Sequence, residues 1–201
     1  MQDPPVPYGV APGSQAEQVG RLILAVALVL FIPALPFGNY LIYPFVILTT
    51  WFHEMGHGLT AMVLGERFEQ LMIFADGSGV AEHSVSGDTS ALTRALIAFG
   101  GPLGPVLAGS GLIIASAHPR AWRPTLWAVT IAILATTIIF VRSPVGFAVL
   151  PIVGAALGLA AWKAPPGLNR FLLQFLGMVG ATSMLADVHY LFTEEVTLGG
   201  N

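Results

Sequence analysis

Six long apolar stretches constrain the fold of this 201-residue chain more than any other feature. Each approaches the roughly 20 residues that a helix needs to cross the hydrocarbon core of a bilayer. The chain is 55% hydrophobic and 9% charged, whereas a soluble domain carries about a quarter charged residues. Because a backbone inside lipid must satisfy its own hydrogen bonds, we predict an all-α membrane protein with about six transmembrane helices. The predicted spans are approximately 19–36, 40–64, 92–117, 124–141, 145–162 and 171–192.

The two ends of the chain set the expected domain boundaries. Residues 1–18 are rich in proline and place acidic side chains ahead of the first apolar stretch, which predicts a disordered tail rather than a signal peptide. Residues 19–192 contain all six predicted spans, and this length favours a single transmembrane domain. Residues 193–201 are expected to form a short C-terminal tail.

One stretch between the second and third spans departs from the apolar pattern. Strand-like residues 70–75 and 80–85 flank the turn Asp76-Gly77-Ser78-Gly79, which is typical of a β-hairpin. We therefore expect a short hairpin directly after the second span, with residues 71–74 available as an edge. An ordinary connection between two helices is the alternative interpretation of this hairpin.

The sparse charge limits the partners of the chain. The net charge is −3 and no basic run occurs, so the electrostatic signature of a nucleic-acid-binding protein is absent. The lipid bilayer is the expected partner, and we expect a multi-pass protein of the cell membrane. Six spans place both chain ends and the hairpin on one side. The eight Lys and Arg residues divide evenly between the two sides, so the positive-inside rule leaves either orientation open.

The second predicted span contains His53-Glu54-Met55-Gly56-His57. On a helix, His53 and His57 lie one turn apart on one face, so two imidazoles can reach one metal ion. Glu54 lies beside them, where it can accept a proton from a water molecule. Ionisable side chains inside an apolar span are costly and indicate a functional site. The chain has no Cys, so any metal must be bound by His, Asp or Glu.

A third metal ligand is expected, because catalytic zinc sites usually have three protein ligands and one open position. Asp187 is the one carboxylate besides Glu54 within a predicted span. Counted from the starts of their spans, His53, His57 and Asp187 lie at depths of roughly 20, 26 and 24 Å. These side chains can meet at one level. His189 lies roughly 200° around the helix from Asp187, and the alternative for Asp187 is a helix-end acid at the membrane interface.

Four features together resemble the site-2 protease family of intramembrane zinc metalloproteases, in particular its small six-span branch. They are the HEMGH helix, the hairpin with the sequence GSGV, the glycine-rich sequence GGPLGP and the late intramembrane Asp187. The resemblance covers about residues 40–192. It implies that His53, His57 and Asp187 bind Zn²⁺ and that Glu54 is the catalytic base.

The resemblance implies an enzyme, a zinc metalloendopeptidase that hydrolyses peptide bonds of transmembrane protein substrates. A helical substrate must unwind before cleavage, and the hairpin is expected to hold the unwound segment by strand addition. One alternative is a membrane metal-binding or transport protein, although the fourth and fifth predicted spans carry almost no polar residues. The other alternative is a proteolytically silent relative that binds membrane proteins, against which the intact Glu54 argues.

Overall fold

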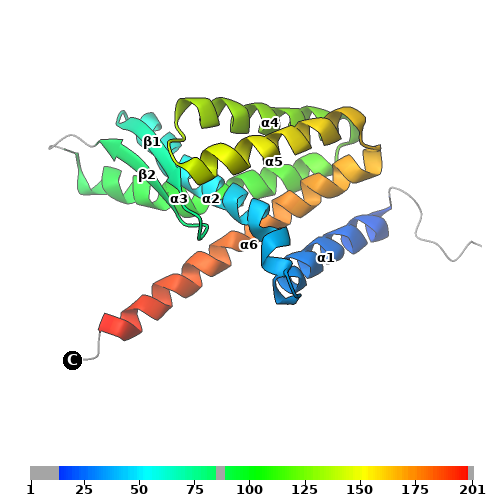
Figure 1. The fold of residues 1–201 in the computed structure, drawn as a ribbon, viewed down its shortest axis with the longest axis horizontal. Helices are drawn as coiled ribbons and strands as arrows, with labels where there is room; N and C mark the ends of the chain where they lie inside the picture. Colours follow the sequence, from blue (N-terminus) through cyan, green and yellow to red (C-terminus); the bar gives the residue numbers. More distant parts are fainter. Residues whose placement is uncertain (1–13, 85–88, 199–201) are drawn as a thin grey trace, which may run out of the picture.

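A computed structural model describes the backbone of residues 14–84 and 89–198, and the side chains in these ranges as far as Ser183. Within these ranges the chain forms six α-helices, two short 3-10 helices and one two-stranded sheet (Figure 1). The α-helices are α1 (Gln15–Phe31), α2 (Gly38–Val63), α3 (Ala91–Ser116), α4 (Trp122–Ile139), α5 (Pro144–Lys163) and α6 (Pro166–Leu198). The remaining elements are η1 (Ile32–Ala34), β1 (Arg67–Ile73), β2 (Gly79–Ser84) and η2 (Pro119–Ala121).

The observed order of elements confirms the predicted helical architecture with a hairpin after the HEMGH helix. The outer boundaries differ from the predicted spans at both ends. Helix α1 begins at Gln15 because Ser14 caps it, accepting a hydrogen bond from the Glu17 backbone at 3.2 Å. Arg21 pairs with Glu17 one turn later. The first turn is therefore polar, and a search for apolar stretches does not include it. Helix α6 continues past the predicted end of the sixth span to Leu198.

Four segments of the described chain are long and apolar enough to cross a membrane, namely Gln15–Ala34, Ala91–Ser116, Pro119–Ile139 and Pro144–Lys163. Large apolar side chains on three of these helices are exposed, which suits contact with lipid rather than with water. Examples are Leu107, Ile114, Ile131, Ile138 and Ile152. The chain is therefore a membrane protein.

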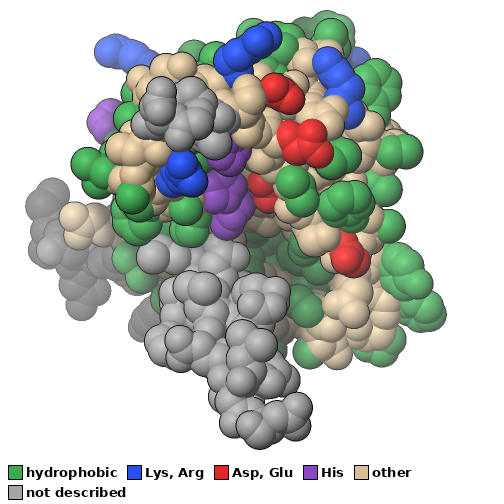
Figure 2. All heavy atoms as spheres, turned by 90° about the vertical axis from the view of Figure 1, so that its left-hand side faces the viewer, with side chains coloured by type: hydrophobic (Ala, Val, Ile, Leu, Met, Phe, Trp, Pro, Cys, Tyr) green, Lys and Arg blue, Asp and Glu red, His purple; other side chains and the backbone are tan. Residues whose placement is uncertain are grey.

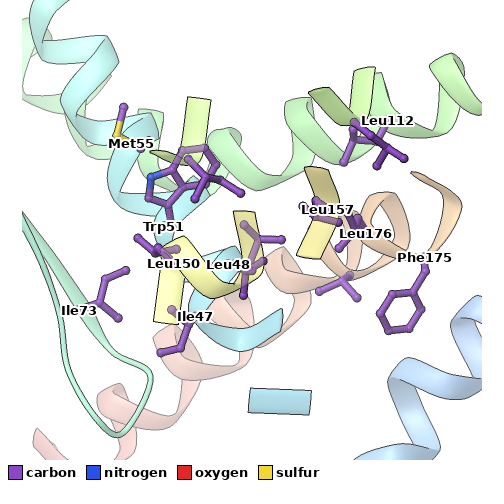
Figure 3. Packing of buried hydrophobic residues seen from close by; sticks show 14 of the residues in the cluster. Ile47, Leu48, Trp51, Met55, Ile73, Leu112, Leu150, Leu157, Phe175 and Leu176 are labelled. Carbon is purple, nitrogen blue, oxygen red and sulfur yellow. The ribbon is translucent and has the colours of Figure 1, made fainter. Parts of the chain in front are cut away.

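Helix α2 lies at the centre of the apolar core. Its residues Ile47, Leu48 and Trp51 are buried and face Leu150 of α5, as Figure 3 shows. The Trp51 indole donates a hydrogen bond to the Thr136 hydroxyl of α4 at 3.0 Å. These contacts fix the rotation of α2, so the opposite side of this helix is directed toward α3 and the hairpin.

Small residues bring α3 close to both α2 and α6. A Cβ on Gly56 of α2 would overlap the carbonyl oxygen of Gly100 on α3. A Cβ on Gly109 of α3 would lie 2.5 Å from the carbonyl oxygen of Gly177 on α6. Such close backbone approach is the usual role of small residues between membrane helices. Helix α3 therefore packs at short range against both α2 and α6.

The sheet corrects one detail of the predicted hairpin. Strands β1 and β2 are antiparallel, with Leu71 opposite Ala81. The other edge of β1 is occupied as well, because the Leu71 N–H donates to Phe140 at 2.9 Å and the Arg142 N–H donates to Leu71 at 3.0 Å. The prediction that residues 71–74 form an exposed edge is therefore wrong. The α4–α5 connection covers β1, which leaves β2 as the outer strand of the described sheet.

Candidate metal centre

His53 and His57 lie one turn apart on α2, and their ring centroids are 4.9 Å apart in an edge-to-face arrangement. Both Nε2 atoms are directed at Gly101 of α3. A Cβ on Gly101 would lie 2.7 Å from Nε2 of His53 and would overlap Nε2 of His57. The two nitrogen atoms therefore lie close together against the backbone of Gly101, where a side chain at residue 101 would not fit. The sequence analysis did not identify this role of Gly101. Gly100 and Gly101 are adjacent and both face α2, and spacing alone does not show which of them contacts the two histidines.

The backbone of α3 also determines which nitrogen of His57 is available. Nδ1 of His57 lies 2.8 Å from the carbonyl oxygen of Ile97, a residue that is 2% exposed. A carbonyl oxygen only accepts hydrogen bonds, so in the neutral ring Nδ1 carries the proton and Nε2 has the lone pair. A hydrogen bond from the second ring nitrogen to a carbonyl is the arrangement that orients metal-binding histidines. His57 is thus prepared for metal binding through Nε2.

Glu54 is 6% exposed and lies between the two histidines in sequence. Strand β2 passes directly over it. A Cβ on Gly79 would lie 2.8 Å from Cγ and 2.9 Å from Oε1 of Glu54, and 2.6 Å from the methyl group of Thr50. Gly79 therefore lets the backbone of β2 approach the carboxylate, which brings the outer strand next to the candidate catalytic group.

Hydrogen bonds hold the tip of the hairpin against α2. The Thr50 hydroxyl donates to the Gly77 carbonyl oxygen at 2.6 Å, and the Tyr43 hydroxyl donates to that of Ala75 at 3.1 Å. Gly77 has φ +90°, a conformation that L side chains rarely adopt. Ser78 donates to the Asp76 carboxylate through its hydroxyl and its backbone N–H, which lowers the pKa of Asp76. The tip is therefore a fixed turn.

Two cavities meet at His53, Glu54 and Gly79. One, of about 290 Å³, extends between α2, the hairpin tip, Pro105 of α3 and Ser183 of α6. The other, of about 490 Å³, extends along β2 and the first turns of α3. Figure 2 looks onto this end of the molecule and shows histidine side chains beside a hollow, with an acidic side chain next to them. The candidate site is thus open on both sides of Glu54.

Helix α6 reaches the site at Ser183, which lines the smaller cavity together with His53 and Glu54. Asp187 follows one helical turn later on the same helix. The side chains of Asp187 and His189 lie outside the described residues. Among the side chains that the structure describes, no cluster of three possible metal ligands occurs, so the third ligand stays a prediction.

A comparison with known protein families decides what kind of protein carries this site. The model of the Peptidase M50B-like family matches residues 22–198. The chain belongs to this family. The match extends from α1 through α6 and agrees with the resemblance to site-2 proteases. No curated protein and no solved structure matches the chain.

Proposed function

We propose that this M50B-like family member is an intramembrane zinc endopeptidase that hydrolyses peptide bonds of membrane-embedded proteins. The observation that carries the proposal is the convergence of the His53 and His57 Nε2 atoms, with buried Glu54 beside them under strand β2. A family of peptidases matches the chain, which agrees with hydrolysis. In this proposal α2 and α6 also cross the membrane, so the protein has six spans.

The residues present fit a zinc ion. Imidazole nitrogens are common zinc ligands, and the hydrogen bond from His57 to Ile97 leaves Nε2 as the binding atom. Because residue 101 has no side chain, both nitrogens can lie close together against α3. We propose Asp187 as the third ligand, because α6 reaches the cavity at Ser183, one turn earlier.

The chain's own groups account for the steps of hydrolysis. When bound, zinc would polarise the scissile carbonyl and lower the pKa of the attacking water. Glu54 accepts the proton of this water as it attacks, and then donates that proton to the amine that leaves. The backbone of Ile97 keeps His57 in the required tautomer throughout. Glu54 is largely covered by β2, and the two cavities that reach it provide the paths for water and substrate.

The outer edge of β2 is the proposed binding place for the unwound substrate. Leu71 directs both backbone groups away from β2, so its partner Ala81 directs its N–H and carbonyl groups away from β1. This orientation is supported by His83, whose Nδ1 lies 3.3 Å from the Ala81 carbonyl oxygen. A substrate strand added at Ala81 would run through both cavities, past Gly79 and Glu54.

The test of this function is cleavage of transmembrane reporter peptides by the purified protein. We expect cleavage to stop when a chelator removes the metal and to return when zinc is added, because hydrolysis depends on the metal. Product is measured by gel electrophoresis and mass spectrometry. Stoichiometric zinc without cleavage of any peptide in a broad panel would contradict a peptidase, and would favour a metal transporter or a silent binder.

Ala81→Pro tests the substrate edge. The substitution removes an N–H that faces outward while leaving the ladder to β1 intact. We expect a decrease of about tenfold or more in cleavage with zinc content unchanged, since a lost backbone hydrogen bond is accompanied by a steric obstacle to strand addition. Ala81→Gly, which retains the N–H, is the matched control. Unchanged cleavage by Ala81→Pro would reduce the hairpin to a connector.

A further inference from the structure

Arg94 provides a positive charge on the wall of the larger cavity. It lies in the first turn of α3 and lines this cavity together with His53, Glu54, His57 and His83. Neither metal binding nor the hydrolysis described above requires a guanidinium at this place. Apart from Gly79, the remaining residues of this cavity are apolar, namely Val80, Ala81, Ile97 and Ala98. A guanidinium at this place can form a charge-assisted hydrogen bond with an anionic group in the cavity.

A chain of hydrogen bonds through Thr89 holds the guanidinium of Arg94 in place. Its Nη2 donates to the Thr89 carbonyl oxygen at 3.2 Å. The Thr89 hydroxyl in turn donates to Glu66 at 2.6 Å, and Thr89 is only 9% exposed. Arginine has five N–H donors in a planar fork that matches the geometry of a carboxylate. Anchoring one nitrogen therefore orients the guanidinium and still permits further hydrogen bonds.

Helix geometry gives the distance from Arg94 to the metal centre, and strand geometry gives the length of β2 along the same cavity. Arg94 precedes Gly101 by seven residues on α3, which is about 10 Å along a helix. His83, on the same cavity, follows Gly79 by four residues on β2, which is about 13 Å along a strand. An extended substrate advances about 3.3 Å per residue. A substrate strand that passes Glu54 therefore brings its third or fourth residue from the scissile bond to this end of the cavity.

We propose that Arg94 is a specificity-determining residue that selects substrates with an Asp or Glu about three or four residues from the scissile bond. This inference rests on the proposed peptidase function. The carboxylate forms a charge-assisted hydrogen bond with Arg94. The preferred substrates are membrane proteins with an acidic residue next to the membrane on the hairpin side, where α3 begins.

The test measures binding rather than cleavage. Fluorescent transmembrane peptides carry a single Glu that is moved one residue at a time along the segment, and Gln peptides serve as references. They are titrated against the full-length Glu54→Gln protein in neutral phosphatidylcholine nanodiscs. We expect one or two adjacent positions at which Glu strengthens binding about tenfold over Gln, as a hydrogen bond to a charged group typically does.

The variants assign this preference to Arg94. Arg94→Ala should abolish the Glu-over-Gln ratio, and Arg94→Glu should reverse it in favour of Lys peptides. Arg67→Ala is the matched control, because Arg67 is an exposed arginine on the adjacent strand that lines neither cavity. Thermal unfolding of each variant checks that the fold is retained. A structural role of Arg94 would weaken all peptides equally and leave the ratio unchanged.

Two results would overturn the proposal. One is equal binding of Glu and Gln peptides at every position. The other is an Arg94→Ala variant that keeps the ratio but loses affinity for nanodiscs with phosphatidylglycerol, which would make Arg94 a contact for lipid phosphate. Peptide binding with the expected ratio, but without cleavage by the wild-type protein, would contradict the peptidase function alone.

Discussion

The Glu54→Gln variant is expected to retain zinc and to lose cleavage by about a hundred- to ten-thousand-fold, the usual range for loss of a general base. Glutamine has nearly the same size as glutamate and fits the narrow space under Gly79, where Oε1 lies 2.9 Å from the position of a Cβ. It cannot accept the proton of the attacking water. The zinc content should not change, because the two histidine nitrogens converge on Gly101 and not on the carboxylate.

Zinc content, substrate binding and cleavage are compared in one membrane preparation. Glu69→Gln is the matched control, since Glu69 is an exposed glutamate on β1 that lines neither cavity. We expect Glu54→Gln to bind substrate as the wild type does and to keep it uncut. Equal cleavage by Glu54→Gln and wild type would remove the proposed proteolytic mechanism. A metal store or transporter has no need of this carboxylate, so the variant distinguishes an enzyme from a binder.

The helices were predictable because membrane spans leave a simple signal. Each apolar stretch had to be a helix in lipid, and the HEMGH spacing placed His53 and His57 on one face. The rings do lie together, 4.9 Å apart. The helix ends were harder to predict. The first turn of α1 is stabilised by the Ser14 cap and the Glu17–Arg21 ion pair, and neither is part of an apolar pattern.

Tertiary pairing was beyond the reach of local patterns. The hairpin strands could be recognised from Gln70 to Val85, but residues 140–142 carry no strand pattern of their own. Their pairing with Leu71 depends on where α4 ends and α5 begins. Because of this pairing β1 is the covered strand and β2 is the outer strand, the reverse of the prediction. The same holds for Gly101 and Ile97. Sequence identifies a glycine-rich helix, whereas the facing of one glycine toward two imidazoles depends on how α3 packs on α2.

Asp187→Asn is the second variant with a large expected effect. Asparagine keeps the shape of the side chain but lacks the negative charge that a zinc ligand supplies. Substitution of a residue that only supports a ligand typically costs about ten- to a hundredfold in metal affinity, so loss of a ligand should cost more. We therefore expect zinc affinity to decrease by more than about a hundredfold, as in His57→Ala, and cleavage to disappear.

His189→Ala is the control for Asp187→Asn, because it lies on the same helix, two residues further on, roughly 200° around the axis. Zinc is measured by elemental analysis after dialysis against a graded series of chelator concentrations, and circular dichroism checks the fold in detergent. Ser183 lines the cavity of His53 and Glu54 one turn before Asp187, which is why Asp187 rather than His189 is the proposed ligand on α6. Full zinc content in Asp187→Asn, or its loss in His189→Ala instead, would show that another residue of α6 completes the site.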